Sequence, residues 1–304
     1  MSPIQRSTCQ FIDSLFRLHR WTPAVKPMED RHTGVNIEMS LKNLIGEMDI
    51  STDIPWYCIS DNASNMKLAI ELSERLIEYF CNNHTIQLMI NDAFKDTDGM
   101  KKLLADTKSL AKFTNKSEPA RKLLEEECKQ AGIKFKTLKN PNDTRWNSAE
   151  ANLSSVLYLK EAIEAAADKS EDFERLCPDK SQWKLIEGAV TLLKPFKDTT
   201  KIWEAEKTAT INRVVERIFF HKEDLEKFIA NKNNNRSGIT FARSLLANLE
   251  KRFPGCGSNY FENKAAIYLD PHYKGICMQS FGKIDHTKDD LENIIDEVDH
   301  EDNN

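Results

Sequence analysis

The spacing of hydrophobic residues changes character once along the chain, near residue 95. Before that point, short extended runs alternate with helical segments. Residues 11–18 and 21–25 have the composition of two extended segments, with a turn expected around residues 18–20. From Gly34 on, apolar residues recur mostly at three- and four-residue steps, which predicts a helix. They are Val35, Ile37, Met39, Leu41, Leu44, Ile45 and Met48.

A strand, an acid and a helix follow in that order. Residues 54–60 are rich in aromatic and branched side chains, which predicts a buried strand of a parallel sheet. Asp61 falls at the carboxyl end of this strand. Residues 62–65 supply capping side chains, and the apolar residues after them predict the start of another helix.

Long amphipathic helices dominate after residue 95. We expect helices near residues 153–167 and 181–194, and Pro195 is expected to interrupt the second. A further helix is expected from about residue 210, followed by a polar loop over residues 231–238 and a last helix near 245–253.

The predicted fold class is α/β plus all-α. We divide the chain into an α/β portion over residues 1–95, a mainly helical portion over 96–280 and an acidic tail over 281–304 that we expect to be disordered. The composition, with 40% hydrophobic and 30% charged residues, is that of a globular protein and excludes a collagen-like or low-complexity chain.

Neither a membrane anchor nor a cysteine framework is expected. No apolar run approaches the roughly 18 residues of a membrane-spanning helix, and no signal core follows Met1, so we expect an intracellular protein with no membrane partner. The 7 cysteines include no CxxC pair, which argues against a disulfide framework and against a four-cysteine zinc site.

The charge is unevenly distributed. The net charge is −5, but residues 285–304 alone carry nine acids and one base. Residues 95–147 hold thirteen Lys or Arg against eight Asp or Glu. This local excess could face nucleic-acid phosphates, although a solvated helical face would have the same composition.

Asp61 is the most informative carboxylate, because ligands and catalytic groups of α/β sheets gather at the carboxyl ends of strands. Magnesium-dependent phosphodiester chemistry needs two or three such carboxylates around its metal ions. An Asp at the end of a strand is also a common helix cap. Both interpretations of Asp61 stay open at this level.

Two further pairs of residues could carry chemistry. Cys81 and His84 lie three residues apart and could give zinc two ligands, but the chain offers no second pair of that spacing, so we expect no zinc site. Arg145 could bind a phosphate and Trp146 could stack on an exposed base of distorted or single-stranded DNA. A capped helix start with a core Trp explains the same residues.

The order and spacing of these motifs resemble the hAT superfamily of DNA transposases, including the zinc-finger BED domain proteins derived from it. Residues 60–66 resemble its strand-end aspartate motif, residues 81–88 its Cys-x-x-His helix and residues 143–148 its Arg-Trp motif. Further segments fit its early strand, its insertion domain and its Leu-Asp-Pro segment. They are residues 11–13, 192–196 with 208–211, and 266–274.

This resemblance implies a ribonuclease H-like core interrupted by a large helical insertion, and cut-and-paste transposition that uses magnesium. Asp61 would be the second acidic metal ligand. Arg145 and Trp146 would lie near a flipped base and hairpin DNA, and Cys81 and His84 would support that neighbourhood.

Several family features are not found. None of the ten residues before the 11–13 segment is Asp or Glu, although the first catalytic aspartate belongs there. The acidic tail stands where the last catalytic glutamate and the dimerisation segment should follow, and there is no BED finger. We therefore expect a truncated core, only a vestigial and weak magnesium ligand at Asp61, no cofactor, no enzymatic activity and no dimerisation through that segment.

The leading hypothesis is a catalytically incompetent transposase-derived protein with a DNA-associated or regulatory role, in transcription, in the nucleus. A protein-interaction scaffold without DNA binding is the first alternative, motivated by the acidic tail. A fragment of an active cut-and-paste transposase is the second. DNA and protein both stay open as partners.

Overall fold

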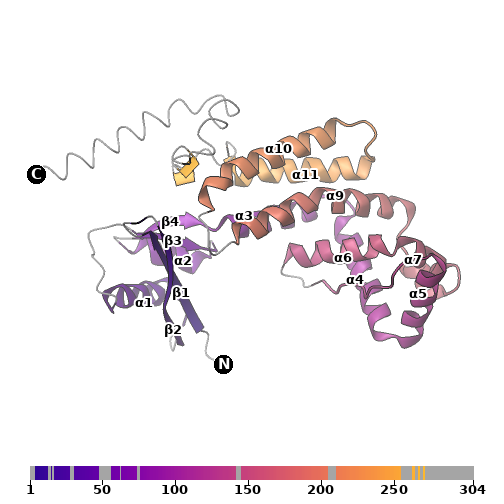
Figure 1. The fold of residues 1–304 in the computed structure, drawn as a ribbon, viewed down its shortest axis with the longest axis horizontal. Coiled ribbons are helices and arrows are strands. Elements are labelled where there is room, and N and C mark those ends of the chain that lie inside the picture. The colour runs from indigo at the N-terminus through magenta and orange to yellow at the C-terminus, as the bar shows by residue number, and fades with distance from the viewer. Residues whose placement is uncertain are drawn as a thin grey trace, which may run out of the picture. The chain divides into compact units, whose positions relative to one another are not determined.

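The computed structural model describes residues 4–12, 15, 17–27, 31–47, 56–61, 63–73, 76–141, 145–204, 210–254, 262–263, 266–267 and 270. The predicted tail over 281–304 and the motif residues 143–144 and 208–209 lie outside these ranges. Contacts divide the chain into two units, residues 1–85 with 204–209 and residues 86–203 with 210–304. The described part is mostly helical with two small sheets (Figure 1).

The first unit opens with a β-hairpin. Strands β1 (Ile4–Ile12) and β2 (Leu18–Pro27) pair antiparallel, with Phe11 opposite His19 and the two rings stacked at 5.1 Å between centroids. The two extended segments are thus confirmed, but the turn expected around residues 18–20 lies earlier. Leu18 already pairs with Ile12, so the connection falls between these two residues.

A helix and a β-α-β segment complete the described part of the first unit. The predicted helix is α1 (Gly34–Glu47). Strands β3 (Trp56–Ser60) and β4 (Leu76–Phe80) pair in parallel and are joined through α2 (Ser64–Glu71). Buried Ile37 of α1 and Ala69 of α2 pack together as a small core.

The strand predicted over residues 54–60 was expected to be buried in a parallel sheet, and this is wrong for one face of β3. Tyr57 is 53% exposed and Ile59 is 65% exposed. The prediction assumed a wider sheet covered on both faces, whereas the described sheet has two strands.

Helix α3 (Asn82–Asp96) leads into the second unit, which is helical throughout its described part. Its first half contains α4 (Met100–Lys116), α5 (Glu118–Gln130), α6 (Trp146–Tyr158), α7 (Lys160–Ala167) and α8 (Glu171–Leu176). It continues with α9 (Lys180–Trp203), the short 3₁₀ turn η1 (Ile211–Arg213), α10 (Val214–Ala230) and α11 (Arg236–Arg252). Helix α9 contacts α6, α10 and α11 (Figure 1). One continuous core of buried side chains runs through these helices.

The sequence predicted that Pro195 would interrupt this helix, and this is wrong. Helix α9 continues through Pro195 to Trp203. Proline removes one backbone hydrogen bond and usually breaks a helix. Here the buried residues Leu193 and Phe196 stand on either side of Pro195, so core packing on both flanks keeps the helix continuous. Tertiary contacts outweigh the local penalty.

The predicted loop over residues 231–238 is shorter in the structure, because α11 already begins at Arg236. The Asn235 side chain caps this helix by accepting a 2.7 Å hydrogen bond from the backbone N–H of Gly238. Gly238 also lies against Gly188 of α9. A Cβ added to Gly188 would lie only 2.8 Å from the Gly238 Cα. Helices α9 and α11 therefore approach closely at two residues without side chains.

Among the described residues, none of the helices has the length and apolar character needed to cross a membrane.

Candidate nucleic-acid interface

A surface pocket of about 740 Å³ lies between α3, α4 and the start of α6. Its floor is mainly apolar, and its rim carries four cations. The floor residues are Phe94, Leu104, Ala105, Trp146 and Ala149, and the rim cations are Lys95, Lys101, Lys108 and Arg145. Asn91 and Pro141 complete the lining, so no carboxylate lines this pocket among the described residues.

Helical spacing explains how the floor and the rim are built. Lys101, Leu104 and Lys108 follow one another at steps of three and four residues, so α4 presents them on one face. Buried Leu103 and Thr107 lie on the other side of the same helix and hold it against the core. The amphipathic pattern of α4 thus fixes where the two lysines that line the pocket lie.

Arg145 is exposed and stands at the N-cap of α6 with extended backbone, φ −126° and ψ 118°. Its carbonyl oxygen accepts hydrogen bonds from the Ser148 N–H at 3.0 Å and the Ser148 hydroxyl at 2.6 Å. These contacts fix the backbone from which the guanidinium projects to the rim. Arg145 is therefore available to an anion in the pocket.

Trp146 is only 2% exposed, and its backbone N–H donates to the Gln87 Oε1 at 3.3 Å. The indole belongs to the main core and forms part of the pocket floor. Of the two interpretations that the sequence left open, this burial fits a core Trp and not an exposed stacking platform.

Asp61 lies at the carboxyl end of β3, as predicted, and is exposed. Its Oδ1 accepts a hydrogen bond of 3.3 Å from the Ala63 N–H, in the connection that leads into α2. The N-cap of α2 is Ala63 and not Asp61. The described contact of the Asp61 carboxylate is therefore the hydrogen bond that closes this turn before the helix. Groups of three or more metal-ligating side chains do not occur within the described ranges.

Cys81 follows β4 directly, as Asp61 follows β3. Because Ser60 pairs with Phe80, the two residues leave the same edge of the sheet, and the Cys81 N–H donates to the Ser60 carbonyl at 3.0 Å. The Cys81 carbonyl accepts from the Thr85 N–H and hydroxyl at 2.9 and 3.1 Å. Half-buried His84 lies in the first turn of α3, so these residues shape a strand-to-helix junction.

The sequence patterns did not single out the rim lysines Lys95, Lys101 and Lys108. The available signals were the positive charge of residues 95–147 and the seven-residue step between Lys101 and Lys108. Neither signal reveals that α3 and α6 supply an apolar floor between these cations.

A second pocket of about 420 Å³, between α9 and α10, contains a buried histidine. His221 stacks on Phe196 at 4.0 Å between ring centroids, and its Nε2 lies 2.8 Å from the Thr199 hydroxyl. Burial, assisted by the nearby charge of Arg217, lowers the pKa of His221 to about 3. The imidazole is neutral at physiological pH and has the surroundings of a core residue.

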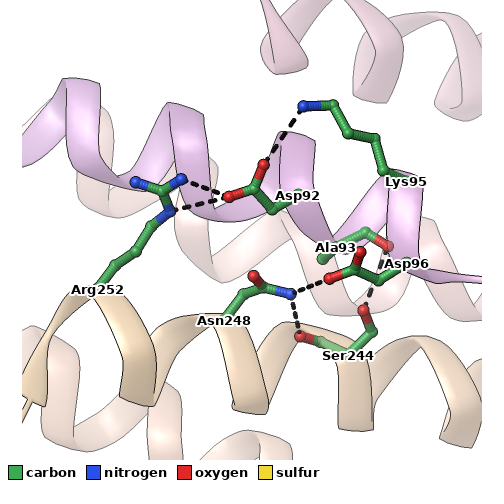
Figure 2. Close-up of polar contacts among 7 residues, drawn as sticks. All are labelled: Asp92, Ala93, Lys95, Asp96, Ser244, Asn248 and Arg252. Carbon is green, nitrogen blue, oxygen red and sulfur yellow. Dashed lines mark hydrogen bonds and ion pairs between the residues drawn. The ribbon is translucent and has the colours of Figure 1, made fainter.

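A polar cluster ties α3 to α11 beside the cationic pocket (Figure 2). The Asp92 Oδ2 accepts hydrogen bonds from the Arg252 Nε, at 3.1 Å, and from its terminal nitrogen, while the Oδ1 lies 3.4 Å from the Lys95 Nζ. Partial burial by itself raises the pKa of Asp92. The hydrogen bonds and charges of Arg252 and Lys95 outweigh that effect, so the pKa lies below its usual value.

We expect Asp92→Asn to lower the free energy of unfolding at neutral pH by about 1–3 kcal/mol, because Arg252 loses a charged partner. The pKa of Asp92 is lower in the folded chain, so its contribution is complete above the unfolded pKa of about 3.9 and declines as pH falls through the folded pKa. Urea unfolding of wild type and variant between neutral and strongly acidic pH measures this difference.

Glu250→Gln is the matched control, because Glu250 lies on α11 like Arg252 and makes an exposed ion pair with Lys222 of α10. A loss below about 1 kcal/mol is expected there. A difference between wild type and Asp92→Asn that stays constant into strong acid would contradict the assignment.

Comparison with known proteins finds similarity to transposase-derived proteins. A family model described as the ZBED1 RNase-like helical domain matches residues 80–192. The chain is 23% identical over 296 residues to the Putative AC transposase of Zea mays, covering 91% of this chain and 35% of that protein. It is 26% identical over 199 residues to Zinc finger BED domain-containing protein 6 of Homo sapiens, covering 64% of this chain and 19% of that protein.

The chain thus spans about a third or less of the length of these curated relatives. These similarities confirm the resemblance that the motifs predicted. The matched range 80–192 includes every residue that lines the cationic pocket.

Proposed function

We propose, from the premise that this chain is a hAT transposase-derived protein, that it binds DNA at the pocket between α3, α4 and α6 without cutting it. The observation that carries this proposal is the combination of a mainly apolar floor with four cations and no carboxylate among the described lining residues. The cations of the rim can bind phosphates, and the apolar floor can contact the flat face of an unstacked base.

The preferred ligand is single-stranded or distorted DNA, because its bases can leave the stack and enter a pocket. Arg145 and the rim lysines bind backbone phosphates through charge, whereas the apolar floor contacts a base without reading its identity. Binding of this kind is salt-dependent and tolerant of sequence.

The first unit contributes no described residue to the proposed DNA-binding pocket. Its β3-α2-β4 segment is a parallel strand pair with a helical connection, as expected for part of a ribonuclease H-like core. Asp61 keeps the strand-end position of a magnesium ligand there, but its described contact is a backbone N–H in a turn. We therefore assign no cofactor to the DNA-binding function.

The proposed cellular role is regulation of transcription in the nucleus. DNA binding without cleavage occupies a site and changes what else can bind there, which suits a regulatory protein derived from a transposase. The similarity to a BED domain-containing protein supports a relation to transposase-derived proteins.

Charge reversal of one rim lysine tests the binding site. We expect Lys101→Glu to weaken binding of a labelled single-stranded oligonucleotide about 5- to 20-fold at low salt, because a phosphate contact becomes a repulsion. The salt dependence should lose about 0.7 from its logarithmic slope. Fluorescence anisotropy over a series of salt concentrations measures both quantities.

The neighbouring Lys102→Glu is the matched control, because Lys102 is exposed on the same helix but does not line the pocket. Equal losses for the two variants would show that total charge, and not the pocket, determines binding.

A protein-interaction scaffold is the alternative function, and the charge of residues 285–304 favours it. The same assay separates the two functions with a chain that lacks these residues. Absence of binding at low salt in both chains would favour the scaffold. Binding that emerges only after the deletion would indicate that the acidic segment competes with DNA.

Absence of cleavage is tested on hairpin DNA and on flanked-end DNA with Mg²⁺ or Mn²⁺. We expect both substrates to stay intact, because Asp61 is engaged in a turn and metal-assisted cleavage needs several converging carboxylates. Gel analysis of end-labelled DNA measures the result. Metal-dependent cleavage that disappears in Asp61→Ala would contradict the proposal.

A further inference from the structure

We infer that the ion pair between Asp92 of α3 and Arg252 of α11 controls how much positive charge Lys95 presents to the pocket, so that the seating of α11 tunes DNA affinity. This inference rests on the proposed DNA-binding function and adds a regulatory element to it. Asp92 and Arg252 act here as positioning residues, because neither of them lines the pocket.

The two oxygens of Asp92 have different partners (Figure 2). Arg252 binds the Oδ2 through two nitrogens, as a fork, whereas Lys95 approaches the Oδ1 at the longer distance of 3.4 Å. The carboxylate charge is thus engaged mainly by Arg252. Lys95 is held weakly, and its side chain is 74% exposed at the rim.

Helix α11 also supports the floor of the pocket. Phe94 lines the pocket and stacks on Phe241 of α11, with 5.8 Å between ring centroids and 11° between ring planes. Helix α3 therefore supplies Phe94 to the floor of the pocket and Lys95 to its rim. Helix α11 contacts Phe94 directly through Phe241, and it is linked to Lys95 through Arg252 and Asp92.

Further polar contacts fix the register of α11 on α3 (Figure 2). The Asn248 side-chain amide donates to the Asp96 carboxylate at 2.9 Å and to the Ser244 carbonyl at 3.0 Å. The Ser244 hydroxyl donates to the Ala93 carbonyl at 3.3 Å. These contacts hold α11 in the position from which Arg252 reaches Asp92.

Charge balance predicts opposite effects for the two members of the pair. Without Arg252, the Asp92 carboxylate loses its main partner and draws Lys95 away from a DNA phosphate. Without the Asp92 carboxylate, Lys95 is released to the rim and its charge is no longer offset. A merely structural ion pair would instead weaken binding whichever member is removed.

Oligonucleotide binding of the full chain tests this inference by fluorescence anisotropy at about 50 mM salt. We expect Asp92→Asn to bind about 3- to 5-fold more tightly than wild type and Arg252→Met to bind about 3- to 5-fold more weakly. The logarithmic salt slope should become steeper in the first variant and shallower in the second.

Two variants of the α10–α11 ion pair are matched controls for total charge. Glu250→Gln changes the net charge as Asp92→Asn does, and Lys222→Met changes it as Arg252→Met does. Neither Glu250 nor Lys222 lines the pocket, so both controls should bind like wild type. Arg252→Lys keeps the charge near Asp92 and should restore most of the binding lost in Arg252→Met.

A double-mutant cycle separates the effect of Lys95 from general destabilisation and does not depend on Arg252→Met folding. In a Lys95→Met background, Asp92→Asn should lose most of its effect on affinity. Circular dichroism at the assay temperature checks that each variant is folded.

The possible failures are distinguishable. If Lys101→Glu weakens binding but Asp92→Asn and Arg252→Met change it in the same direction, or leave it unchanged, the control by α11 is wrong and the binding site stands. If Asp92→Asn keeps its full effect without Lys95, the control through Lys95 is wrong. If Lys101→Glu and Lys102→Glu bind alike, the pocket itself is wrong and this inference fails with it.

Discussion

Helix α3 makes contacts with residues that lie far away in the sequence, and the packing of the second unit depends on these contacts. Gln87 binds the backbone at the start of α6, Asp92 binds Arg252 at the end of α11, and Phe94 stacks on Phe241. The residues on α3 are separated from their partners by about 60 to 160 positions, so each contact closes a long loop of chain. The helices between α3 and α11 must fold compactly for these contacts to form.

This arrangement also explains why the cationic pocket is where it is. Helices α3 and α4 are consecutive, and α6 is attached to α3 through Gln87, so their exposed faces enclose a hollow with an apolar floor. Lys95 and Lys101 at its rim are exposed, so their charged ends can meet a ligand from solution. Carboxylates such as Asp92 and Asp96 belong to the same helix α3, but they face α11 and are engaged there. Because neither Asp92 nor Asp96 lines the pocket, the charged residues of its described lining are all cations, which attract anions.

Local sequence patterns predicted the elements whose stability is local. The spacing of Ile37, Leu41 and Leu44 predicted α1, and the run around Tyr57 predicted β3 with Asp61 at its end. Strand β4 was not predicted, because its five residues lie between two helical patterns. The continuation of α9 through Pro195 was not predicted either, since it depends on packing by other helices.

The candidate site was predicted in part. Arg145 and Trp146 were singled out, but composition could not distinguish an exposed Trp from a core Trp, and only the fold shows that this indole is buried. The ion pair between Asp92 and Arg252 could not be predicted from a local sequence pattern, because the two residues are 160 positions apart. The excess of positive charge over residues 95–147 indicated a class of partner without indicating which lysines gather around a pocket.

Hydrogen–deuterium exchange of the full chain, with and without a single-stranded oligonucleotide at low salt, shows whether the cationic pocket is where DNA binds. We expect slower exchange in the segments that line the pocket, residues 91–108 and 145–149, and loss of this protection at high salt. Protection confined to other helices, such as α5 or α10, or no protection under conditions where the oligonucleotide binds, would contradict it.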